Sequence, residues 1–416
     1  MELKRVAVTG LGVLTPIGNN VNDFWDNLLK GTSGSDLITR FDVTNFKTKF
    51  ACEVKNFNAE DHFDRKEAKK LDLYAQFALV AAAEAMKDSG LEPEKLDLDR
   101  AGVIFGSGIG GFSTIFNELG EYFKGDGVPR FSPFFIPKLI SDIAAGQISM
   151  KYGFRGPNFA TVSACATSTN AIIDAFNYIR LGKAKVFITG GSEASITIPG
   201  LGGFNAMQAL STNNEEYKSA SRPFDATRDG FVMGEGAGAL ILEELEHAKK
   251  RGARIYCELV GGGLTADAYH LTAPHPDGLG AANVMKFALE DAGMNPGELD
   301  YINVHGTSTP LGDISETKAI KSVFGEHAYK LNISSTKSMT GHLLGAAGVV
   351  ESIASILSIV NSIVPPTINL KTLDPQIDPN LNLTANAAQE RKVNAALSNT
   401  FGFGGHNTSA IYKKFA

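Results

Sequence analysis

Cysteine is scarce in this chain, and its scarcity excludes one class of protein. Of the 416 residues only three are cysteine, namely Cys52, Cys165 and Cys257, an odd number at wide spacing. Such a set cannot build the disulfide framework of a small secreted protein, and it fits a reducing compartment. A chain of this length buries a core without such cross-links. Each cysteine is therefore predicted to be a free thiol.

Long apolar runs and blocks of basic charge are also missing. The chain begins without an apolar signal segment, and no stretch of about 18 uninterrupted apolar residues occurs. It carries 39 Lys and Arg against 45 Asp and Glu, a formal net charge of −6. These absences predict a soluble, cytoplasmic protein whose main partner is neither a nucleic acid nor a membrane.

Glycine, in contrast, is abundant, with 44 residues in 416, where a share of about 7% is usual. The glycines are dispersed and form no low-complexity tract. We therefore expect them at tight turns and at close approaches of the backbone.

The sequence also repeats itself. Residues 87–97 reappear as residues 290–300, about half a chain later. In both copies an amphipathic helix ends at a glycine and a β-rich run follows. Alternating strands and helices with short turns indicate an α/β fold. The duplication predicts two halves related by a pseudo-twofold axis, residues 1–250 and 251–416, with one site between them.

Two further features extend this prediction. The segments 165–181 and 342–361 are small or apolar on nearly every side, so we expect helices sandwiched between two sheets. The segments 112–140 and 191–230 have no counterpart in the second half. They are interpreted as insertions that cover the site or build an interface.

Cys165 is the first candidate for chemistry. A thiol at the start of a helix lies near unsatisfied N–H groups and the positive end of the helix dipole, which lowers its pKa and favours the nucleophilic thiolate. A buried structural cysteine is the alternative. Cys52 and Cys257 lie in β-like runs, and for them the structural interpretation is preferred.

His305 and His342 occupy related places in the repeat, a strand end and a helix start. Ligands of layered α/β folds gather at the carboxyl ends of strands, so both histidines are expected to face one crevice with Cys165. A zinc site is the competing interpretation of one cysteine and two histidines. It lacks the closely spaced ligand pair of protein zinc sites, and no metal is predicted.

Residues 6–12 contain the glycines of a possible dinucleotide loop, but Thr15 stands at the third glycine position and Pro16 follows it. No acidic ribose contact and no P-loop lysine motif occur either. The sequence therefore predicts no nicotinamide cofactor.

Four segments carry a resemblance to a known family, namely 163–168, 304–309, 335–342 and 399–405. Over essentially its whole length the chain resembles the β-ketoacyl-acyl carrier protein synthases, condensing enzymes of the thiolase superfamily, and most of all their elongating synthase II type. Starter synthases carry Cys-His-Asn and thiolases carry a second cysteine, whereas His342 holds the third position here. The resemblance implies a thiolase-like duplicated fold with α-β-α-β-α layers.

The resemblance also implies a reaction, the decarboxylative condensation that lengthens a fatty acyl chain by two carbons. Cys165 would take the acyl group from a carrier protein thioester, with the backbone N–H groups of Cys165 and Phe403 as the oxyanion hole. His305 and His342 would stabilise the enolate formed as malonyl loses carbon dioxide. Lys337, with Glu351 as its acidic partner, would set the local field and hold the histidines.

Substrate contacts follow from the same resemblance. Thr307 and Thr309 match the hydroxyls that bond the phosphopantetheine arm, and Thr272 is a further expected substrate-binding residue. The arm arrives on the acyl carrier protein, so no bound cofactor is expected. Ile109 and Phe204 match the floor of the acyl pocket.

Two further segments have implied roles in motion and assembly. Phe403, flanked by glycines, matches a gate that opens on acylation. Phe135 and Ile136 match a segment that reaches towards the pocket of a partner subunit, which implies a homodimer.

Carrier proteins are acidic, so a basic docking patch is expected. The residues proposed for it are Arg65, Lys66, Lys69, Lys70 and Arg130. The alternative is an ordinary solvated helix face, which is what most charge runs are.

Two other functions stay open at this point. A ketosynthase of a specialised polyketide or aryl-polyene pathway shares every catalytic residue. A non-catalytic chain-length factor is disfavoured, because such subunits usually lose the nucleophilic cysteine. The acyl chain length and branching preference do not follow from the sequence.

Overall fold

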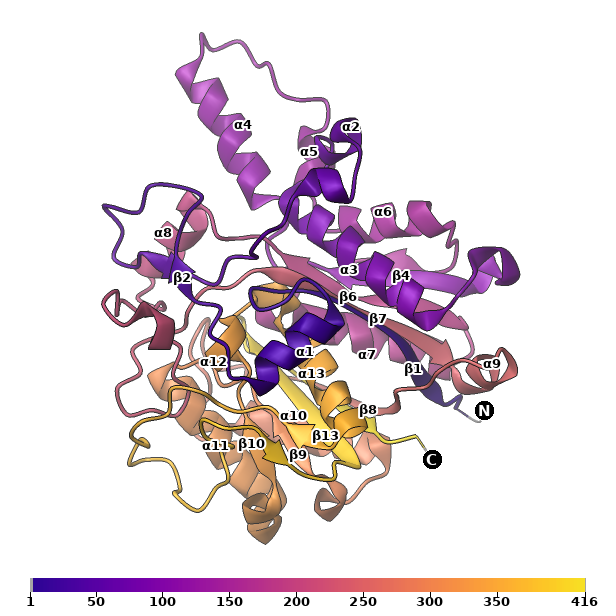
Figure 1. The fold of residues 1–416 in the computed structure, drawn as a ribbon, viewed down its shortest axis with the longest axis vertical. Coiled ribbons are helices and arrows are strands. Elements are labelled where there is room, and N and C mark those ends of the chain that lie inside the picture. Colours follow the sequence, from indigo (N-terminus) through magenta and orange to yellow (C-terminus); the bar gives the residue numbers. More distant parts are fainter. Residues whose placement is uncertain (1–2, 416) are drawn as a thin grey trace.

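The structure, a computed structural model that describes residues 3–415, is built on a ten-stranded mixed sheet (Figure 1). In spatial order the strands are β10 (Asn332–Ser334), β9 (Tyr301–Asn303), β13 (Ala395–Gly402), β14 (His406–Lys413), β8 (Cys257–Ala266), β1 (Val6–Leu14), β7 (Gly236–Glu244), β6 (Val186–Glu193), β4 (Ala101–Gly106) and β5 (Asn158–Phe159). Two short ribbons lie apart from it, β2 (Asp36–Leu37) with β3 (Phe50–Ala51) and β11 (Ile363–Val364) with β12 (Gln389–Glu390).

The sheet consists of two equivalent halves. Read outward from its centre, the first half runs β1, β7, β6, β4, β5 and the second runs β8, β14, β13, β9, β10. In each half the central strand pairs antiparallel with its neighbour, and the outer strands pair parallel. The predicted duplicated α/β fold is confirmed. The junction, where Val6–Val8 of β1 pair antiparallel with Cys257–Leu259 of β8, was not predicted.

Helices complete five layers. On the outer face of the first half lie α3 (Leu73–Ser89) and α6 (Ile143–Tyr152), and on that of the second lie α10 (Leu279–Ala292) and its neighbour α11 (Pro310–Phe324). Between the halves lie α7 (Thr167–Arg180) and α13 (Ala347–Asn361), each in contact with strands of both halves (Figure 1). The predicted sandwiched helices are thus present.

The composition of α13 explains its central position. Its apolar residues, such as Val349, Ile353 and Ile356, are fully buried. Its serines Ser352 and Ser355 donate their hydroxyl hydrogens to carbonyls four residues earlier, so their polar atoms are satisfied within an apolar layer. The segment Leu344–Asn361 is long and apolar enough to cross a membrane, but 89% of it is buried inside the protein, as expected of a core helix.

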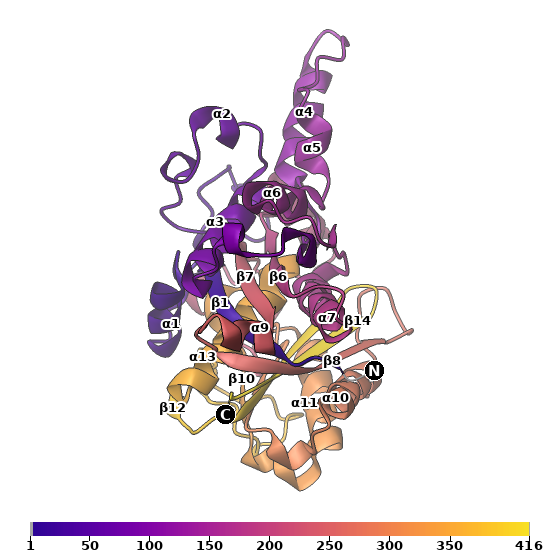
Figure 2. The ribbon, with the colours of Figure 1, turned by 90° about the vertical axis from the view of Figure 1, so that its right-hand side faces the viewer.

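The predicted insertions stand out from these layers. Residues 112–140 form α4 (Phe112–Lys124) and α5 (Phe135–Leu139), which project from the first half as an arm (Figure 2). Residues 191–230 contain α8 (Ile198–Ala206). The second half has an insertion of its own, residues 362–394, which the sequence analysis did not anticipate.

The remaining helices are short: α1 (Val21–Leu29), α2 (Arg65–Ala68), α9 (Leu245–Lys250) and α12 (Lys337–Thr340). The proposed boundary at 250/251 falls between α9 and β8. Because the sheet continues across it, the division into two domains stays a prediction.

Candidate active site

Cys165 lies in a 3-10 turn, Ala164–Ala166, that leads directly into α7. Its neighbour Ala164 has a φ of +51°, so the turn is held in a left-handed conformation that alanine rarely adopts. Gly402, at the end of β13, passes close to it, because a Cβ there would lie 3.1 Å from the Cys165 nitrogen. The two halves of the fold therefore meet at the backbone of Cys165.

The thiol of Cys165 is only 8% exposed. Burial raises its pKa to about 12, against the opposing effects of the Lys337 ammonium and the backbone N–H groups of Phe403 and Cys165. The prediction of a lowered pKa is therefore wrong for this closed arrangement. Burial of the thiol outweighs the N–H groups and the dipole at the helix terminus.

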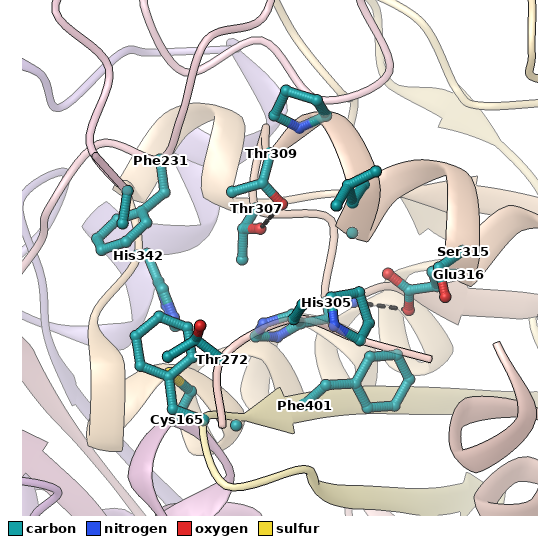
Figure 3. A pocket seen from close by; sticks show the side chains of 18 of the residues that line it. Cys165, Phe231, Thr272, His305, Thr307, Thr309, Ser315, Glu316, His342 and Phe401 are labelled. Atoms are coloured by element: carbon teal, nitrogen blue, oxygen red, sulfur yellow. Dashed lines mark hydrogen bonds between the residues drawn. The ribbon is translucent and has the colours of Figure 1, made fainter. Parts of the chain in front are cut away.

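His305 follows β9, and His342 lies between α12 and α13. Their rings are 5.3 Å apart and nearly perpendicular, and both face the space above Cys165 (Figure 3). His342 does not begin a helix as predicted. It is fixed by backbone hydrogen bonds instead, because its N–H donates to the Val232 carbonyl at 2.7 Å and its carbonyl accepts from the Gly234 N–H at 2.8 Å.

Both imidazoles are neutral. Burial, and then the charge of Lys337, holds the pKa of His305 and of His342 well below the ordinary value. In the part of the chain that the structure describes, no group hydrogen-bonds to Nδ1 of either ring. A buried N–H without an acceptor is rarer and costlier than an unpaired acceptor, so we assign the single proton of each ring to Nε2.

Glu316, on α11, is a site residue that the sequence analysis missed. Its carboxylate accepts from the backbone N–H of His305 at 2.9 Å (Figure 3). It also accepts from the backbone N–H of Gly306 at 2.9 Å and from the Asn399 side chain at 3.2 Å. Burial raises its pKa to about 7. The sequence did contain a sign of this role, because Asp313, Glu316 and Ile320 lie on one face of the helix. Acidic residues on a buried helix face need polar partners inside the protein.

Lys337 and Glu351 form a buried ion pair between α12 and α13, with side chains only 1% and 3% exposed. Burial raises the pKa of Glu351 to about 7, while the ammonium of Lys337 acts in the opposite direction. Neither residue lines the pocket. Lys337 acts on the site through its charge, which favours the neutral form of both histidines.

These elements enclose a pocket of about 390 Å³. Of the residues predicted for the site, those that line it are Cys165, His305, His342, Phe403, Phe204, Thr272, Thr307 and Thr309. Ile109 does not line it, but packs in the same apolar cluster as Cys165 and Phe204.

Glu193, at the end of β6, is a second residue that the sequence analysis missed. It is fully buried and accepts from the backbone N–H groups of Gly108 and Gly345 at 2.9 and 3.1 Å. The loop that carries Ile109 is thereby tied to the turn that begins α13. Nothing in the local sequence marks Glu193, because its partners lie far away along the chain.

The other predicted residues lie away from the pocket lining. Phe135 and Ile136 lie on α5, within the projecting arm. Arg65 and Lys66 lie on α2, whereas Lys69 and Lys70 follow its last residue, Ala68. The side chain of Lys70 lies 5.5 Å from the centre of the Phe134 ring, on the arm.

Arg130, also on the arm, forms a two-point ion pair with Asp126 at 2.8 and 2.9 Å, so part of its charge is already compensated. Among residues 3–415, no three His, Cys, Asp or Glu side chains form a group that could hold a metal ion.

Comparison with known proteins agrees with this geometry. Residues 3–248 match the family described as Beta-ketoacyl synthase, N-terminal domain, and residues 256–371 match Beta-ketoacyl synthase, C-terminal domain. The chain is 53% identical to 3-oxoacyl-[acyl-carrier-protein] synthase 2 of Staphylococcus aureus (strain COL), over 99% of both chains. It is 49% identical to the protein of that name from Synechocystis sp., over 100% of this chain and 99% of the relative.

A solved ketosynthase from a type II polyketide system, in complex with its acyl-carrier protein and bound to a hexaketide, is similar in fold. It has a TM-score of 0.91 and 36% identity, over 99% of this chain and 100% of that one. With both family domains matched and full-length relatives at 53% and 49% identity, the chain belongs to the β-ketoacyl synthase family of condensing enzymes.

Proposed function

We propose that Cys165, His305 and His342 carry out the decarboxylative condensation of malonyl-acyl carrier protein with an acyl group held on Cys165. The observation that carries this proposal is their convergence: one thiol and two neutral imidazoles from both halves of the fold line one pocket. A nucleophile beside two N–H donors suits the formation of a carbon–carbon bond at a thioester.

The chain is an elongating condensing enzyme of fatty acid synthesis. The identities of 53% and 49% to 3-oxoacyl synthases exceed the 36% identity to the polyketide ketosynthase, which favours fatty acyl chains over a specialised polyketide product. The presence of Cys165 also argues against a non-catalytic chain-length factor.

In the first half-reaction, the Cys165 sulfur attacks the acyl thioester, its proton passes to the departing pantetheine thiolate, and an acyl-cysteine forms. The raised pKa of Cys165 means that the thiol gives up its proton as the new bond forms, and does not rest as a thiolate. The backbone N–H groups of Cys165 and Phe403 are the proposed donors to the tetrahedral oxyanion.

In the second half-reaction, malonyl thioester loses carbon dioxide, and the electron pair of the broken bond forms an enolate. The Nε2–H groups of His305 and His342 donate to the enolate oxygen. The enolate carbon then attacks the acyl-cysteine and displaces the Cys165 sulfur as a thiolate, which takes a proton from solvent. Hydrogen-bond donors to such an oxyanion are each worth about 2.7–4 kcal/mol.

Charge and burial fit the two histidines to this role. A neutral imidazole can donate from Nε2 without losing its proton, and the charge of Lys337 keeps both rings neutral. Glu316 fixes the backbone of His305, and the Lys337–Glu351 pair stands behind the site. Lys337 therefore acts through its charge, and Glu351 is its buried ion-pair partner.

Substrate binding is assigned to the rest of the pocket. Thr272, Thr307 and Thr309 are proposed to contact the phosphopantetheine arm, and Ile109 and Phe204 to bound the acyl chain. Phe403 is the proposed gate. Its loop contains Gly404 and Gly405 at φ of +87° and +76°, so it depends on glycine conformations.

The proposed partners are an acyl carrier protein and a second copy of the chain. The phosphopantetheine group comes with the carrier protein, and no cofactor of the enzyme itself is required. Arg65, Lys66, Lys69, Lys70 and Arg130 are the proposed docking residues. Homodimerisation is supported by the projecting arm of residues 112–140, on which the apolar side chains of Phe123 and Ile136 are 78% and 57% exposed. The proposed compartment is the cytoplasm.

The proposal is tested by trapping the acyl-enzyme. The wild-type chain and Cys165→Ala are incubated with acyl carrier proteins loaded with chains of increasing length, and intact mass is measured. The expected result is one added acyl mass on the wild type, located on Cys165 by peptide mapping, and none on the variant. Acylation of the variant would overturn the assignment, and the preferred chain length is read from the same series.

A further inference from the structure

The hydroxyls of Thr307 and Thr309 lie side by side in the pocket, with their oxygens 3.0 Å apart (Figure 3). Between them Ser308 has a φ of +68°, a left-handed conformation that serine rarely adopts. Such a backbone persists only where its surroundings hold it. The question is which residues hold this loop.

Part of the answer is backbone contact with the 191–230 insertion. The Ser308 carbonyl accepts from the Gly230 N–H at 3.2 Å, and the Ser308 hydroxyl oxygen accepts from the Arg222 N–H at 3.0 Å. The Ser308 N–H donates to the Asp313 carboxylate at 3.2 Å. The N–H, the carbonyl and the hydroxyl of Ser308 therefore each form a hydrogen bond with another residue of the same chain.

Arg228, in the same insertion, holds the other end of the loop. Its Nε donates to the Thr309 carbonyl at 3.1 Å and its Nη2 donates to the Pro310 carbonyl at 2.7 Å. The guanidinium side chain is 1% exposed. These two bonds fix the backbone between the second threonine and the first residue of α11.

The charge of Arg228 is fully compensated within the protein. Nη1 donates to Asp374 at 2.7 Å and to the Asp225 carbonyl at 2.8 Å, and Nε lies 3.2 Å from the carboxylate of Asp313. The planar fork of an arginine can serve these acceptors together, whereas the single ammonium of a lysine cannot. Arg228 therefore joins three segments that are far apart in the sequence.

We propose that Arg228 is a positioning residue for the phosphopantetheine arm, which it serves by fixing the Thr307–Thr309 loop so that both hydroxyls face the arm. Arg228 does not line the pocket, so it acts through Thr309 and Pro310. This inference rests on the proposed function, because it assigns the arm to the two threonines. It predicts that Arg228 matters for substrates that carry the arm and not for the bond-breaking step.

The test compares two malonyl donors. Malonyl-pantetheine carries the arm, whereas the S-ethyl thioester of malonate has neither its amides nor its length. Decarboxylation of both is measured with the wild type and with Arg228→Lys, Ser308→Gly and Thr309→Val. Arg180→Lys is the matched control, because Nη1 of Arg180 donates to both carboxylate oxygens of Asp291 outside the pocket lining.

Arg228→Lys is expected to raise KM for malonyl-pantetheine about tenfold, with kcat and the rate on the ethyl thioester within twofold of wild type. Such a change corresponds to about 1.4 kcal/mol. Thr309→Val should raise KM for malonyl-pantetheine in the same way. The double variant Arg228→Lys/Thr309→Val should raise this KM no more than the more severe of the two single variants does. Arg180→Lys should leave the ratio of the two donors unchanged.

If Arg228→Lys lowers the activity on both donors by the same factor, so that the ratio of the two activities stays at the wild-type value, Arg228 serves only the general stability of the fold. If Arg228→Lys does not fold, Ser308→Gly decides whether the loop must be held, because glycine adopts the left-handed conformation without strain but lacks the hydroxyl that accepts from the Arg222 N–H. Ser308→Gly should also raise KM for malonyl-pantetheine alone, and an unchanged KM would overturn the proposal. A wild type that decarboxylates neither of these donors nor malonyl-acyl carrier protein would instead refute the proposed function.

Discussion

At the scale of single residues, the site is governed by buried ionisable side chains in and around the pocket wall. Lys337, Glu351 and Glu316 lie around the two histidines, and all three are 3% exposed or less. Burial and the charge of Lys337 keep both imidazoles neutral, and Glu316 holds the His305 backbone. The histidines should therefore matter most in the step where negative charge develops on the substrate.

His305→Ala and His342→Ala are each expected to reduce malonyl decarboxylation by 10²–10³-fold, roughly 2.7–4 kcal/mol in the barrier. Transfer of the acyl group to Cys165 should survive in part, because it depends on the thiol and the backbone N–H groups. Release of carbon dioxide and acyl-enzyme mass report the two steps separately. His62→Ala, at an exposed position, is the control. Equal loss of both steps would contradict this division of roles.

Glu316 predicts a pH dependence of stability. Its folded-state pKa of about 7 lies above its ordinary value of 4.5, so between these pH values the folded chain binds a proton that the unfolded chain does not. Its contribution is fully present below pH 4.5 and is lost as pH rises through 7. At about 1.4 kcal/mol per unit, the loss amounts to roughly 3 kcal/mol.

The measurement is the free energy of unfolding in urea at pH 5 and pH 8, for the wild type and Glu316→Gln. The difference between the two proteins should change by roughly 2–3 kcal/mol over this range, to the disadvantage of the wild type at high pH. The exposed variant Glu60→Gln should follow the wild type. A difference that does not vary with pH would disprove the raised pKa.

Local sequence could reveal only part of this site. Cys165, His305 and His342 stand at turns of the repeat, and their convergence followed from the fold class. Glu193 and Arg228 carry no such mark, because their partners lie up to 152 residues away. The sign of the pKa shift at Cys165 was wrong because burial depends on the whole assembled pocket, and the argument used only the helix terminus.

At the scale of elements, the close contact of α7 and α13 depends on small residues. Gly348, in the first turn of α13, faces α7 so closely that a Cβ would lie 2.0 Å from the Thr169 hydroxyl oxygen and 3.1 Å from its nitrogen. The small and apolar composition of 165–181 and 342–361 predicted that these helices are sandwiched between sheets. The repeat did not predict the β1–β8 junction, because three antiparallel residue pairs leave no pattern in either strand.

Two glycine-to-alanine variants test this packing. Gly348→Ala should destabilise the protein by about 1–3 kcal/mol, because α7 and α13 must move apart. Gly120→Ala, within α4, meets nothing within 4 Å, so it should stabilise by about 0.5–1 kcal/mol. Urea unfolding measures both. If Gly348→Ala unfolds with the wild-type free energy, the contact between α7 and α13 has space for a methyl group.

At the scale of the whole molecule, the projecting arm exposes apolar side chains that nothing within residues 3–415 of the single chain covers. Phe123, Val128 and Ile136 are 78%, 50% and 57% exposed, and they lie on one segment that stands away from the layers (Figure 2). Apolar surface of this kind marks an interaction site. The proposed homodimer would cover it.

Sedimentation equilibrium at micromolar concentration should therefore give about twice the chain mass of 44.3 kDa. Ile136→Glu, which places a charge on the arm, should shift the population towards the single chain and expose apolar surface to a hydrophobic dye. Leu37→Glu, at an exposed site on β2, is the control and should leave the mass unchanged. A wild type that sediments as a single chain would refute the dimer.

The central claim is that Cys165 carries the acyl group while the two histidines promote decarboxylation. The most direct test incubates the wild type and Cys165→Ala with malonyl- and acyl-carrier proteins, and measures condensation product and carbon dioxide in the same reaction. Cys165→Ala should form no condensation product and should still release carbon dioxide, because His305 and His342 remain in place. Condensation at an unchanged rate in Cys165→Ala would contradict the account.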